Sequence, residues 1–182
     1  KTDTFEYYPA LYKLVTGALP IEVSVPLATI FSDTTKVERI VGTYTGIDQS
    51  RQVVSYEQDG TIQEMSYDYA VLAFGSETNY FNIPGLTELS FSFKSVTEAL
   101  RLKRHFCELF ANAATLSKDE LVKRLHVVVV GGGPSGVELA GDLRSFLTNL
   151  AGSVKIDPNL ITIDLIEGGA RVLPTLSEKI SK

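Results

Sequence analysis

The sequence predicts an α/β fold that combines a parallel sheet with an antiparallel three-stranded meander. Three observations lead to this prediction. A glycine-rich turn joins an apolar β-branched run to a helical pattern at residues 126–141, a second apolar run follows at 160–166, and short alternating runs occupy 36–65. Apolar β-branched runs predict buried strands and alternating runs predict half-buried strands, so both kinds of sheet are expected in one chain.

Composition narrows the class of protein. The 182 residues suit one large or two small domains. Lys and Arg number 17 against 22 Asp and Glu, and a net charge of -5 gives no case for nucleic-acid binding. The single cysteine, Cys107, excludes an internal disulfide and a CxxC redox or zinc site, and we expect it to be buried or half-buried.

The sequence shows neither a transmembrane helix nor a signal peptide, because its apolar runs are too short. The chain begins with a lysine rather than a methionine, and residues 176–182 begin a helical pattern that then stops. We therefore expect an internal piece of a longer protein.

The first half of the chain predicts one short helix, the meander and one buried strand. Residues 5–19 place apolar side chains at helical spacing, and Gly17 lies close to the expected helix end. Within the meander, Asp-Gly at residues 59–60 is a two-residue hairpin signal. Residues 70–74 form an apolar run that ends at Gly75, so a buried strand followed by a glycine turn is expected there.

Two helices are predicted between residues 95 and 125. Ser95 followed by Glu98, and Ser117 followed by Glu120, match the capping-box pattern that starts a helix. Apolar residues then recur at three- and four-residue spacing, which predicts one buried face on each helix. The expected core positions are Ala99, Leu102, Phe106, Phe110, Leu121, Val122 and Leu125.

The glycine-rich turn has the spacing and the context of a dinucleotide-binding loop. Gly131 allows the sharp turn, Gly133 lets backbone approach a pyrophosphate, and Gly136 lets the helix pack closely on its strand. A GxGxxG pattern alone is weak, but this one follows an apolar strand and precedes an amphipathic helix. The alternative is a glycine-rich turn in some other α/β unit. The predicted cofactor-binding residues are Gly131, Gly132, Gly133, Pro134, Ser135 and Gly136.

The second apolar run ends on Glu167, which is the predicted ribose-binding residue. A carboxylate at this position can accept hydrogen bonds from both ribose hydroxyls and would repel a 2′-phosphate, so NAD(H) is favoured over NADP(H). Glu167 lies farther past Gly136 than the usual spacing of about 20 residues. We interpret residues 149–159 as an insertion that lengthens the crossover.

Four stretches together resemble the FAD-dependent pyridine nucleotide oxidoreductases, flavoproteins with two dinucleotide-binding domains. Within that family the chain is most similar to the type II NADH dehydrogenases, which are single-chain NADH:quinone oxidoreductases. The resemblance implies a Rossmann-like FAD/NAD(P)-binding fold. The stretches are TFEYYPALYKLVTGAL (4–19), YDYAVLAFGSETNYFNIPG (67–85), FKSVTEALRLKRHF (93–106) and VVVVGGGPSGVELAGDL (127–143), the last followed by DLIEGGARVLP (164–174).

The resemblance also implies which residues lie near a flavin. The strand-end motif of the family reads Ala-Thr-Gly and lies against FAD, whereas here it is Ala73-Phe74-Gly75, so the threonine contact is lost. Tyr44, in a Gly-Thr-Tyr-Thr stretch, matches a place where main-chain groups meet the adenine of the flavin. Glu138 matches a glutamate near the nicotinamide and the flavin, and is the predicted catalytic residue. Its alternative interpretation is an exposed glutamate that the helix dipole favours.

We predict a partial FAD-binding domain with the meander at residues 1–92, and an NAD(H)-binding domain, incomplete at its carboxyl end, at residues 93–182. The implied function is an FAD-dependent NADH dehydrogenase that passes a hydride from NADH to the flavin and electrons on to a quinone. This piece alone is expected to be inactive. One alternative is a flavin reductase for a soluble protein or oxygen. The other is a non-catalytic nucleotide-binding module, which only the Phe74 departure supports.

The resemblance sets the expected cofactors and partners. The cofactors are FAD and NAD(H), the partners are NADH and a quinone or other electron acceptor, and neither a metal nor a nucleic acid is expected. It implies a cytoplasmic protein that binds peripherally to the inner face of the cell membrane through a segment outside this chain. It is also compatible with a homodimer.

Overall fold

The computed structural model describes residues 3–33 and 36–181, apart from the side chain of residue 114, and contains two compact units. One unit runs up to Leu27 and resumes at Glu77, and the other is Ala28–Ser76. The predicted boundary between residues 92 and 93 divides the chain by expected function rather than by packing. That assignment of an FAD-binding and an NAD(H)-binding domain stays a prediction.

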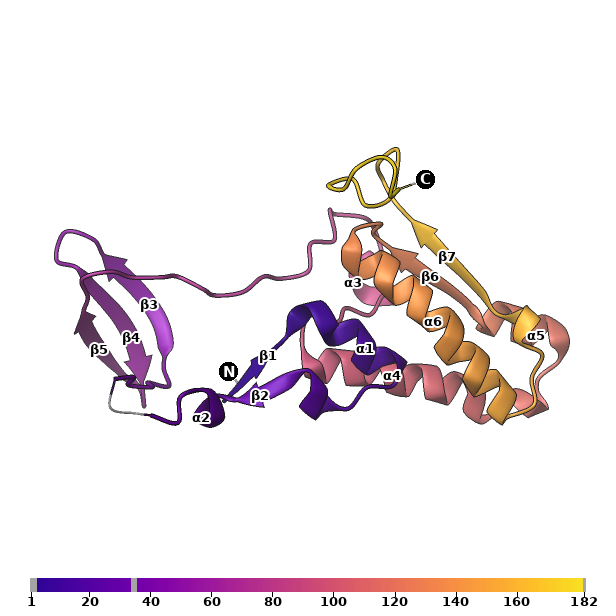
Figure 1. Cartoon of the computed structure of the whole chain (residues 1–182), viewed down its shortest axis with the longest axis horizontal. Coiled ribbons are helices and arrows are strands. Elements are labelled where there is room, and N and C mark those ends of the chain that lie inside the picture. Colours follow the sequence, from indigo (N-terminus) through magenta and orange to yellow (C-terminus); the bar gives the residue numbers. More distant parts are fainter. Residues whose placement is uncertain (1–2, 34–35, 182) are drawn as a thin grey trace. The chain divides into compact units, whose positions relative to one another are not determined.

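The first unit contains the predicted strand, glycine turn and helix. Strand β6 (His126–Val130) leads into helix α6 (Pro134–Ser153), and the chain returns as strand β7 (Thr162–Ile166) (Figure 1). The two strands are parallel and pair along their whole length. Parallel neighbours need a crossover connection, usually a helix, and α6 supplies it. The predicted βαβ arrangement is therefore confirmed.

This sheet is buried on one face only, whereas the sequence predicted two wholly buried strands. Val127 and Val129 point to the core, while Val128 and Val130 are 47% and 51% exposed. Side chains alternate across a strand, so the exposed pair shares the other face. That face borders a groove of about 700 Å³ that residues between 78 and 93 also line. An open groove thus stands where a second packed layer was expected.

Both helices predicted between residues 95 and 125 are present. Helix α4 spans Val96–Ala111 and helix α5 spans Lys118–Arg124. Ser117 and Glu120 form the predicted capping box at the start of α5. The Ser117 Oγ accepts from the Glu120 N–H at 3.4 Å, and the Glu120 carboxylate accepts from the Ser117 N–H at 2.8 Å. The reciprocal bonds satisfy two backbone donors that a helix start leaves without intrahelical partners.

Helix α4 starts with only half of its predicted box. The Ser95 hydroxyl accepts from the Glu98 N–H at 3.2 Å, but the Glu98 carboxylate accepts from the Lys94 N–H at 2.7 Å. The predicted core positions are otherwise correct except for Val122, which is exposed. The buried ones are Ala99, Leu102, Phe106, Phe110, Leu121 and Leu125.

The amino-terminal residues add a helix and a small sheet to the same unit. Helix α1 (Leu11–Thr16) ends at Gly17, whose φ of 135° suits glycine, as the sequence predicts. The sequence analysis missed strands β1 (Thr4–Glu6) and β2 (Ser24–Pro26), which pair antiparallel. The remaining short elements of the chain are helices α2 (Leu27–Ile30) and α3 (Leu86–Leu89) and the 3-10 turns Tyr8–Ala10, Pro20–Glu22, Ala113–Thr115 and Pro158–Leu160.

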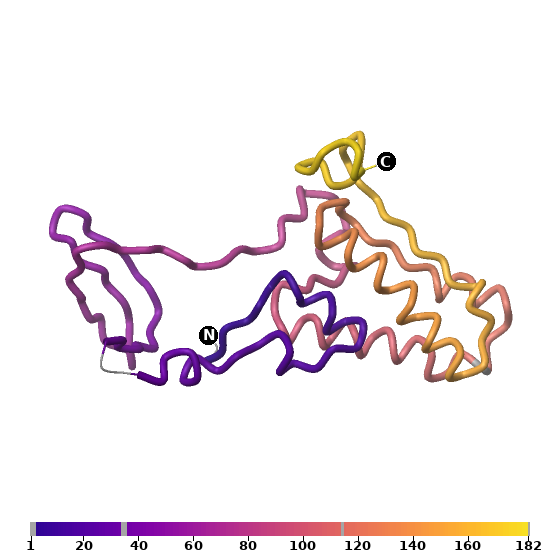
Figure 2. Tube along the Cα trace, in the orientation of Figure 1, coloured from indigo at the N-terminus to yellow at the C-terminus, as the bar shows by residue number. Residues whose placement is uncertain are grey.

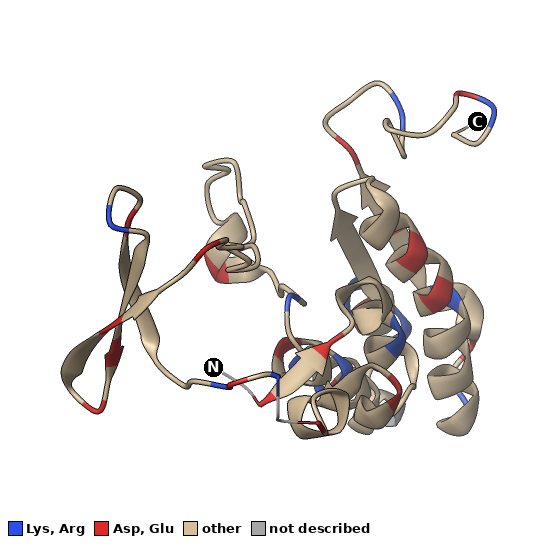
Figure 3. Cartoon of the chain, turned by 60° about the vertical axis from the view of Figure 1, so that its left-hand side comes forward, with Lys and Arg blue, Asp and Glu red and all other residues tan. Residues whose placement is uncertain are grey.

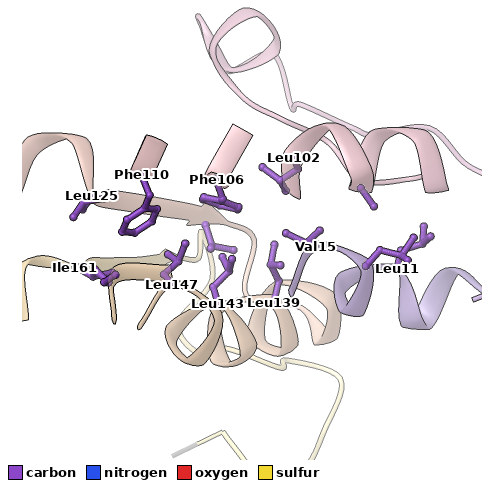
Figure 4. Close-up of a cluster of buried hydrophobic side chains, with 14 of the residues drawn as sticks. Leu11, Val15, Leu102, Phe106, Phe110, Leu125, Leu139, Leu143, Leu147 and Ile161 are labelled. Carbon is purple, nitrogen blue, oxygen red and sulfur yellow. The ribbon is translucent and has the colours of Figure 1, made fainter. Parts of the chain in front are cut away.

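One hydrophobic core holds this unit together. Helix α1 packs against α4 and α6, and the side chains of these helices meet those of the β6–β7 sheet (Figure 4). Full burial of a leucine or phenylalanine contributes about 1.5–3 kcal/mol. The glycine turn therefore joins elements that pack into a stable core. The most buried side chains of this core include Leu11, Leu14, Val15, Leu143 and Leu147.

The long crossover between α6 and β7 is ordered rather than a loose insertion. Helix α6 continues through Ser153, and Lys155 then takes a positive φ of 60° to reverse the chain. Ile156 and Ile161 are both buried and anchor the return. The extra residues predicted at 149–159 thus form the last turn of the helix and a packed connection.

The second unit is the predicted meander. Strands β3 (Thr43–Asp48), β4 (Val53–Gln58) and β5 (Thr61–Ser66) are antiparallel in the order β3-β4-β5, and the trace runs back and forth in sequence (Figure 2). Asp59 and Gly60 have φ values of 51° and 76°. Two consecutive positive φ angles define the tight hairpin turn that an Asp-Gly pair favours, so the hairpin prediction is confirmed.

The predicted buried strand at residues 70–74 is wrong. This stretch has no regular secondary structure, and Val71 and Phe74 are 90% and 64% exposed. A strand needs a neighbour to pair with its backbone groups. Among the strands of the described residues, none pairs with this segment. The apolar composition alone therefore does not make a strand here.

Three smaller expectations were also tested. Cys107 is exposed, because it points away from the core face that its neighbour Phe106 occupies on α4. The helical pattern predicted at 176–182 gives only turns up to residue 181, and residue 182 lies outside the described part. Among the described residues, no helix combines the length and apolar character that crossing a bilayer requires.

Candidate functional site

The glycine turn, residues 131–136, lies at the carboxyl end of the parallel strands. Gly131 has a φ of +111°, which side chains other than glycine rarely adopt. Its N–H donates to the Ile166 carbonyl oxygen at 2.8 Å, so the start of the turn is tied to the last residue of β7. Open α/β sheets bind ligands at this end of their strands.

Two glycines of the turn differ in what surrounds them. A Cβ added to Gly136 would overlap the carbonyl oxygen of Gly131, so the close approach of helix and turn requires glycine there. A Cβ added to Gly133 would meet no protein atom within 4 Å. Packing therefore explains Gly136 but not Gly133, and the space beside Gly133 is open to a ligand.

Glu167 follows β7 directly, and its carboxylate reaches back to the glycine turn. Its Oε2 accepts from the Gly132 N–H at 2.6 Å, and its Oε1 accepts from the Gly169 N–H at 2.8 Å. These backbone donors, Gly169 first and then Gly132, hold the pKa of Glu167 below its ordinary value. The side chain is therefore ionised at neutral pH and fixed beside the turn.

The start of helix α6 supplies backbone donors next to this carboxylate. Pro134 is the first helical residue, so the missing proline N–H costs no hydrogen bond. The N–H groups of Ser135 and Gly136 lie in the first turn, where the helix offers them no acceptor. Such a helix start favours an anion through its donors and its dipole, so it fits a phosphate group.

Glu138 lies in the first turns of the same helix. Its side chain is exposed, and it forms neither a hydrogen bond nor an ion pair within the described part of the chain. Figure 3 shows that the helices carry charged residues of both signs. The geometry allows both interpretations of Glu138, a ligand-facing acid and a solvent-exposed one.

The second predicted group of cofactor residues lies in the other unit. The rings of Tyr44 and Phe74 are in contact, with centroids 4.8 Å apart and planes tilted by 49°. Gly75, next to Phe74, has a φ of +82°, and an added Cβ there would meet no atom within 4 Å. Ala73 is exposed beside them. The structure thus brings Tyr44 close to the 73–75 segment, as expected if both lie near one flavin.

The segment after Glu167 also contacts the glycine turn, and this contact was not predicted from the sequence. The Leu173 N–H donates to the Gly132 carbonyl oxygen at 2.7 Å. The Val172 Cγ1 would lie 3.0 Å from a Cβ added to Gly132. The only local signal is Pro174, which marks a turn but not its partner.

The open face of the β6–β7 sheet carries one polar pair. The His126 Nε2 and the Asp164 Oδ2 lie 2.7 Å apart across the two strands. In the described residues, His, Cys, Asp and Glu side chains do not gather in a group of three or more that could hold a metal ion. The pair is therefore treated as a cross-strand contact of the sheet.

A parallel βαβ unit, a glycine turn at the strand ends and an acidic residue after the second strand together define a dinucleotide-binding protein of the Rossmann class. Residues 2–182 match the family described as pyridine nucleotide-disulphide oxidoreductase, and the chain belongs to this family. The family that the sequence resemblance implies is thereby confirmed.

Two similar proteins are named as quinone oxidoreductases. The chain is 37% identical over 123 residues to the mitochondrial external alternative NAD(P)H-ubiquinone oxidoreductase B1 of Arabidopsis thaliana, which covers 64% of this chain and 21% of the relative. It is 29% identical over 186 residues to the type II NADH:quinone oxidoreductase Ndh of Mycobacterium tuberculosis, covering 100% of this chain and 40% of the relative. The chain thus spans less than half the length of these relatives.

Two solved structures have a similar fold. NDH2 from Plasmodium falciparum in complex with NADH has a TM-score of 0.82 and 27% identity, and the match covers 99% of this chain and 38% of that one. The sulfide:quinone oxidoreductase of Aquifex aeolicus has a TM-score of 0.62 and 27% identity, covering 81% and 32%. The predicted Rossmann-like α/β fold class with its meander is confirmed.

Proposed function

We propose that this chain is part of an FAD-dependent enzyme that oxidises NADH and reduces a quinone. The observation that carries the proposal is the ionised Glu167 carboxylate fixed beside an open glycine turn. The similarity to proteins named as NADH:quinone oxidoreductases, and to an NDH2 solved with NADH, supports the choice of substrates.

The glycine turn would hold the pyrophosphate of NADH. The N–H groups of Ser135 and Gly136 would donate to its oxygens, and the helix dipole would favour its charge. Gly133 leaves room for this approach because an added Cβ there meets no protein atom. These residues bind and orient the nucleotide, which brings the hydride to be transferred within reach of its acceptor.

Glu167 would select NADH over NADPH. Its carboxylate can accept hydrogen bonds from the two hydroxyls of the adenosine ribose. A glutamate carboxylate is ionised at neutral pH, and the backbone donors lower its pKa further, so its negative charge would repel a 2′-phosphate. Because the side chain is already held by Gly132 and Gly169, little of its freedom is left to lose when the nucleotide binds.

FAD, when bound, supplies the acceptor for the hydride and releases electrons to the quinone. We assign Tyr44, Ala73, Phe74 and Gly75 to its site, because they lie together and expose backbone and aromatic surface. Phe74 cannot donate the hydrogen bond that a threonine would. Glu138 would lie near the reacting rings and keep the nicotinamide end oriented. Its alternative role is a surface acid that only stabilises the helix start.

A quinone acceptor implies a membrane surface, since quinones with long isoprenoid tails dissolve in the bilayer. We therefore propose that the full-length protein associates peripherally with a membrane, on the cytoplasmic side. Flotation of the full-length protein with liposomes would support this if protein rises with the lipid. Protein that stays in the dense fraction would contradict it. The homodimer stays a prediction.

The absorption spectrum of the full-length protein tests the function. We expect a flavin spectrum that bleaches when NADH is added without air, and that returns when a soluble quinone analogue is added. Absence of flavin, or a flavin that NADH does not reduce, would contradict the enzyme assignment. Recovery with oxygen or a soluble protein but not with quinone would instead favour the flavin-reductase alternative.

A further inference from the structure

We propose that Arg171 is a positioning residue that holds the glycine turn in its binding conformation. This inference rests on the proposed function, because it concerns how the same turn receives NADH. Arg171 follows Glu167 by four positions, in the segment that loops back after β7 (Figure 2). The hydrogen-bond partners of Arg171 do not include the residues predicted to bind the nucleotide, so any effect of Arg171 on NADH binding must act through other residues.

The guanidinium of Arg171 organises this whole segment. Its Nη1 donates to the Leu173 carbonyl oxygen at 3.2 Å and to the Ser181 Oγ at 2.6 Å. Its Nη2 donates to the Pro174 carbonyl oxygen at 2.7 Å and to the Leu176 carbonyl oxygen at 3.0 Å. Four acceptors spread over residues 173–181 thus converge on one half-buried side chain.

The segment held by Arg171 is in direct contact with the glycine turn. Leu173 has a positive φ of 49°, which is costly for a bulky side chain and needs support from its surroundings. In this conformation its N–H reaches the Gly132 carbonyl oxygen at 2.7 Å. Arg171 binds the carbonyl on the other side of Leu173, so it stabilises the same strained residue.

Gly132 then carries the effect to the nucleotide site. Its carbonyl is fixed by Leu173, its Cα is flanked by Val172, and its N–H is bonded to Glu167. If the segment moved, Gly132 would lose one of the two hydrogen bonds that fix its peptide groups. The pyrophosphate loop and the ribose acid would then have to be ordered by the nucleotide itself, which would weaken binding.

Arginine suits this task better than lysine. A planar guanidinium presents five donors in a fixed fork, whereas an ammonium has three donors on one nitrogen. A lysine at position 171 would keep the charge and much of the length but could not reach acceptors on both sides of the fork. Arg171→Lys therefore removes the geometry of the clamp while changing little else.

The test is anaerobic reduction of the flavin by NADH in the full-length protein, with the wild type, Arg171→Lys and Arg104→Lys compared. Arg104 is the control, because it is exposed on α4 and its nearest acid, Glu108, is 3.7 Å away. For Arg171→Lys we expect the KM or Kd for NADH to rise about tenfold with the limiting rate within about twofold. Arg104→Lys should match the wild type in both.

A wild-type affinity for NADH in Arg171→Lys overturns the inference, even if the variant melts at a lower temperature. That combination would mean that the clamp stabilises the fold without tuning the site. If Arg171→Lys cannot be purified, Ser181→Ala removes one acceptor and should raise the KM for NADH about fivefold, and a KM within about twofold of the wild type overturns the inference. If NADH does not reduce the flavin of the wild-type protein, both the proposed function and the inference that rests on it are contradicted.

Discussion

Two apolar runs in this chain end on a glycine, and only one becomes a strand. Residues 126–130 end at Gly131 and form β6, because β7 pairs with them along their whole length. Residues 70–74 end at Gly75 and remain exposed without regular structure, because the described strands offer them no partner. An apolar run predicts a tendency to form a strand, and a neighbouring strand decides whether it forms.

The two glycines differ in the same way. Gly131 is tied to the end of β7 by its N–H and lies under the start of α6. Gly75 has a similar positive φ but follows a segment that pairs with none of the described strands. An added Cβ would meet no atom within 4 Å at either glycine, so the difference lies in the backbone contacts. The glycine turn is therefore held by the packed elements around it, and the 73–75 segment is a set of exposed groups.

The largest effect on the KM for NADH should come from Gly136→Ala. The added methyl would overlap the Gly131 carbonyl oxygen, which is backbone and cannot move aside without opening the turn. Overpacking of this kind costs about 1–3 kcal/mol. We expect the KM for NADH in the full-length protein to rise by up to about a hundredfold, or the NADH response to be lost.

Gly75→Ala makes the same substitution in the exposed 73–75 segment. The positive φ of Gly75 should cost about 1–2 kcal/mol in an alanine, with no steric overlap. The KM for NADH should stay within about twofold. Equal losses of NADH affinity in Gly136→Ala and Gly75→Ala would contradict the distinction between the packed glycine turn and the exposed 73–75 segment.

An intermediate effect is expected from Gly133→Ala. No protein atom opposes the new methyl, so the melting temperature should stay close to that of the wild type. Binding should nevertheless weaken about tenfold, because the methyl would occupy the space beside the proposed pyrophosphate. Titration of NAD(H) together with a thermal melt checks both. Unchanged affinity would remove Gly133 from the site.

The smallest effect is the pH dependence that Glu167 contributes. Its pKa is lowered in the folded state from an ordinary value of 4.5, since the carboxylate accepts from Gly169 and Gly132. Its stabilising contribution should be complete above that value and be lost as the pH falls through the lowered pKa. Melting temperatures of wild type and Glu167→Gln should therefore differ by a constant amount above pH 4.5 and converge as the pH falls below it through the lowered pKa. A constant difference would show that the charge of Glu167 is unimportant for stability.

Sequence patterns predicted the elements whose partners are close in the chain. The Ser117 capping box and the Asp-Gly hairpin depend on a few adjacent residues, and both were correct. The buried face of α4 follows from helical spacing alone. The strand predicted at 70–74 and the burial of Cys107 failed, because each depends on which neighbours arrive from elsewhere.

In the candidate site, too, the features set by nearby residues could be predicted and those set by distant contacts could not. The glycine turn and Glu167 could be predicted from the sequence. The spacing of the glycines identifies the loop, and the apolar run before Glu167 predicts that this residue follows the second strand. The contact of Leu173 with Gly132, and the four acceptors around Arg171, could not. They depend on a left-handed leucine and on the return path of an irregular segment, for which a single sequence carries no periodic signal.

If Glu167 binds the adenosine ribose of NADH, its replacement should change the preference of the enzyme for NADH over NADPH. The measurement is the ratio of kcat/KM for NADH to that for NADPH, in the full-length wild type and in Glu167→Arg. We expect the wild type to prefer NADH and the ratio to fall by about a hundredfold or more in the variant, since a guanidinium attracts the 2′-phosphate that a carboxylate repels. An unchanged ratio would contradict the ribose assignment.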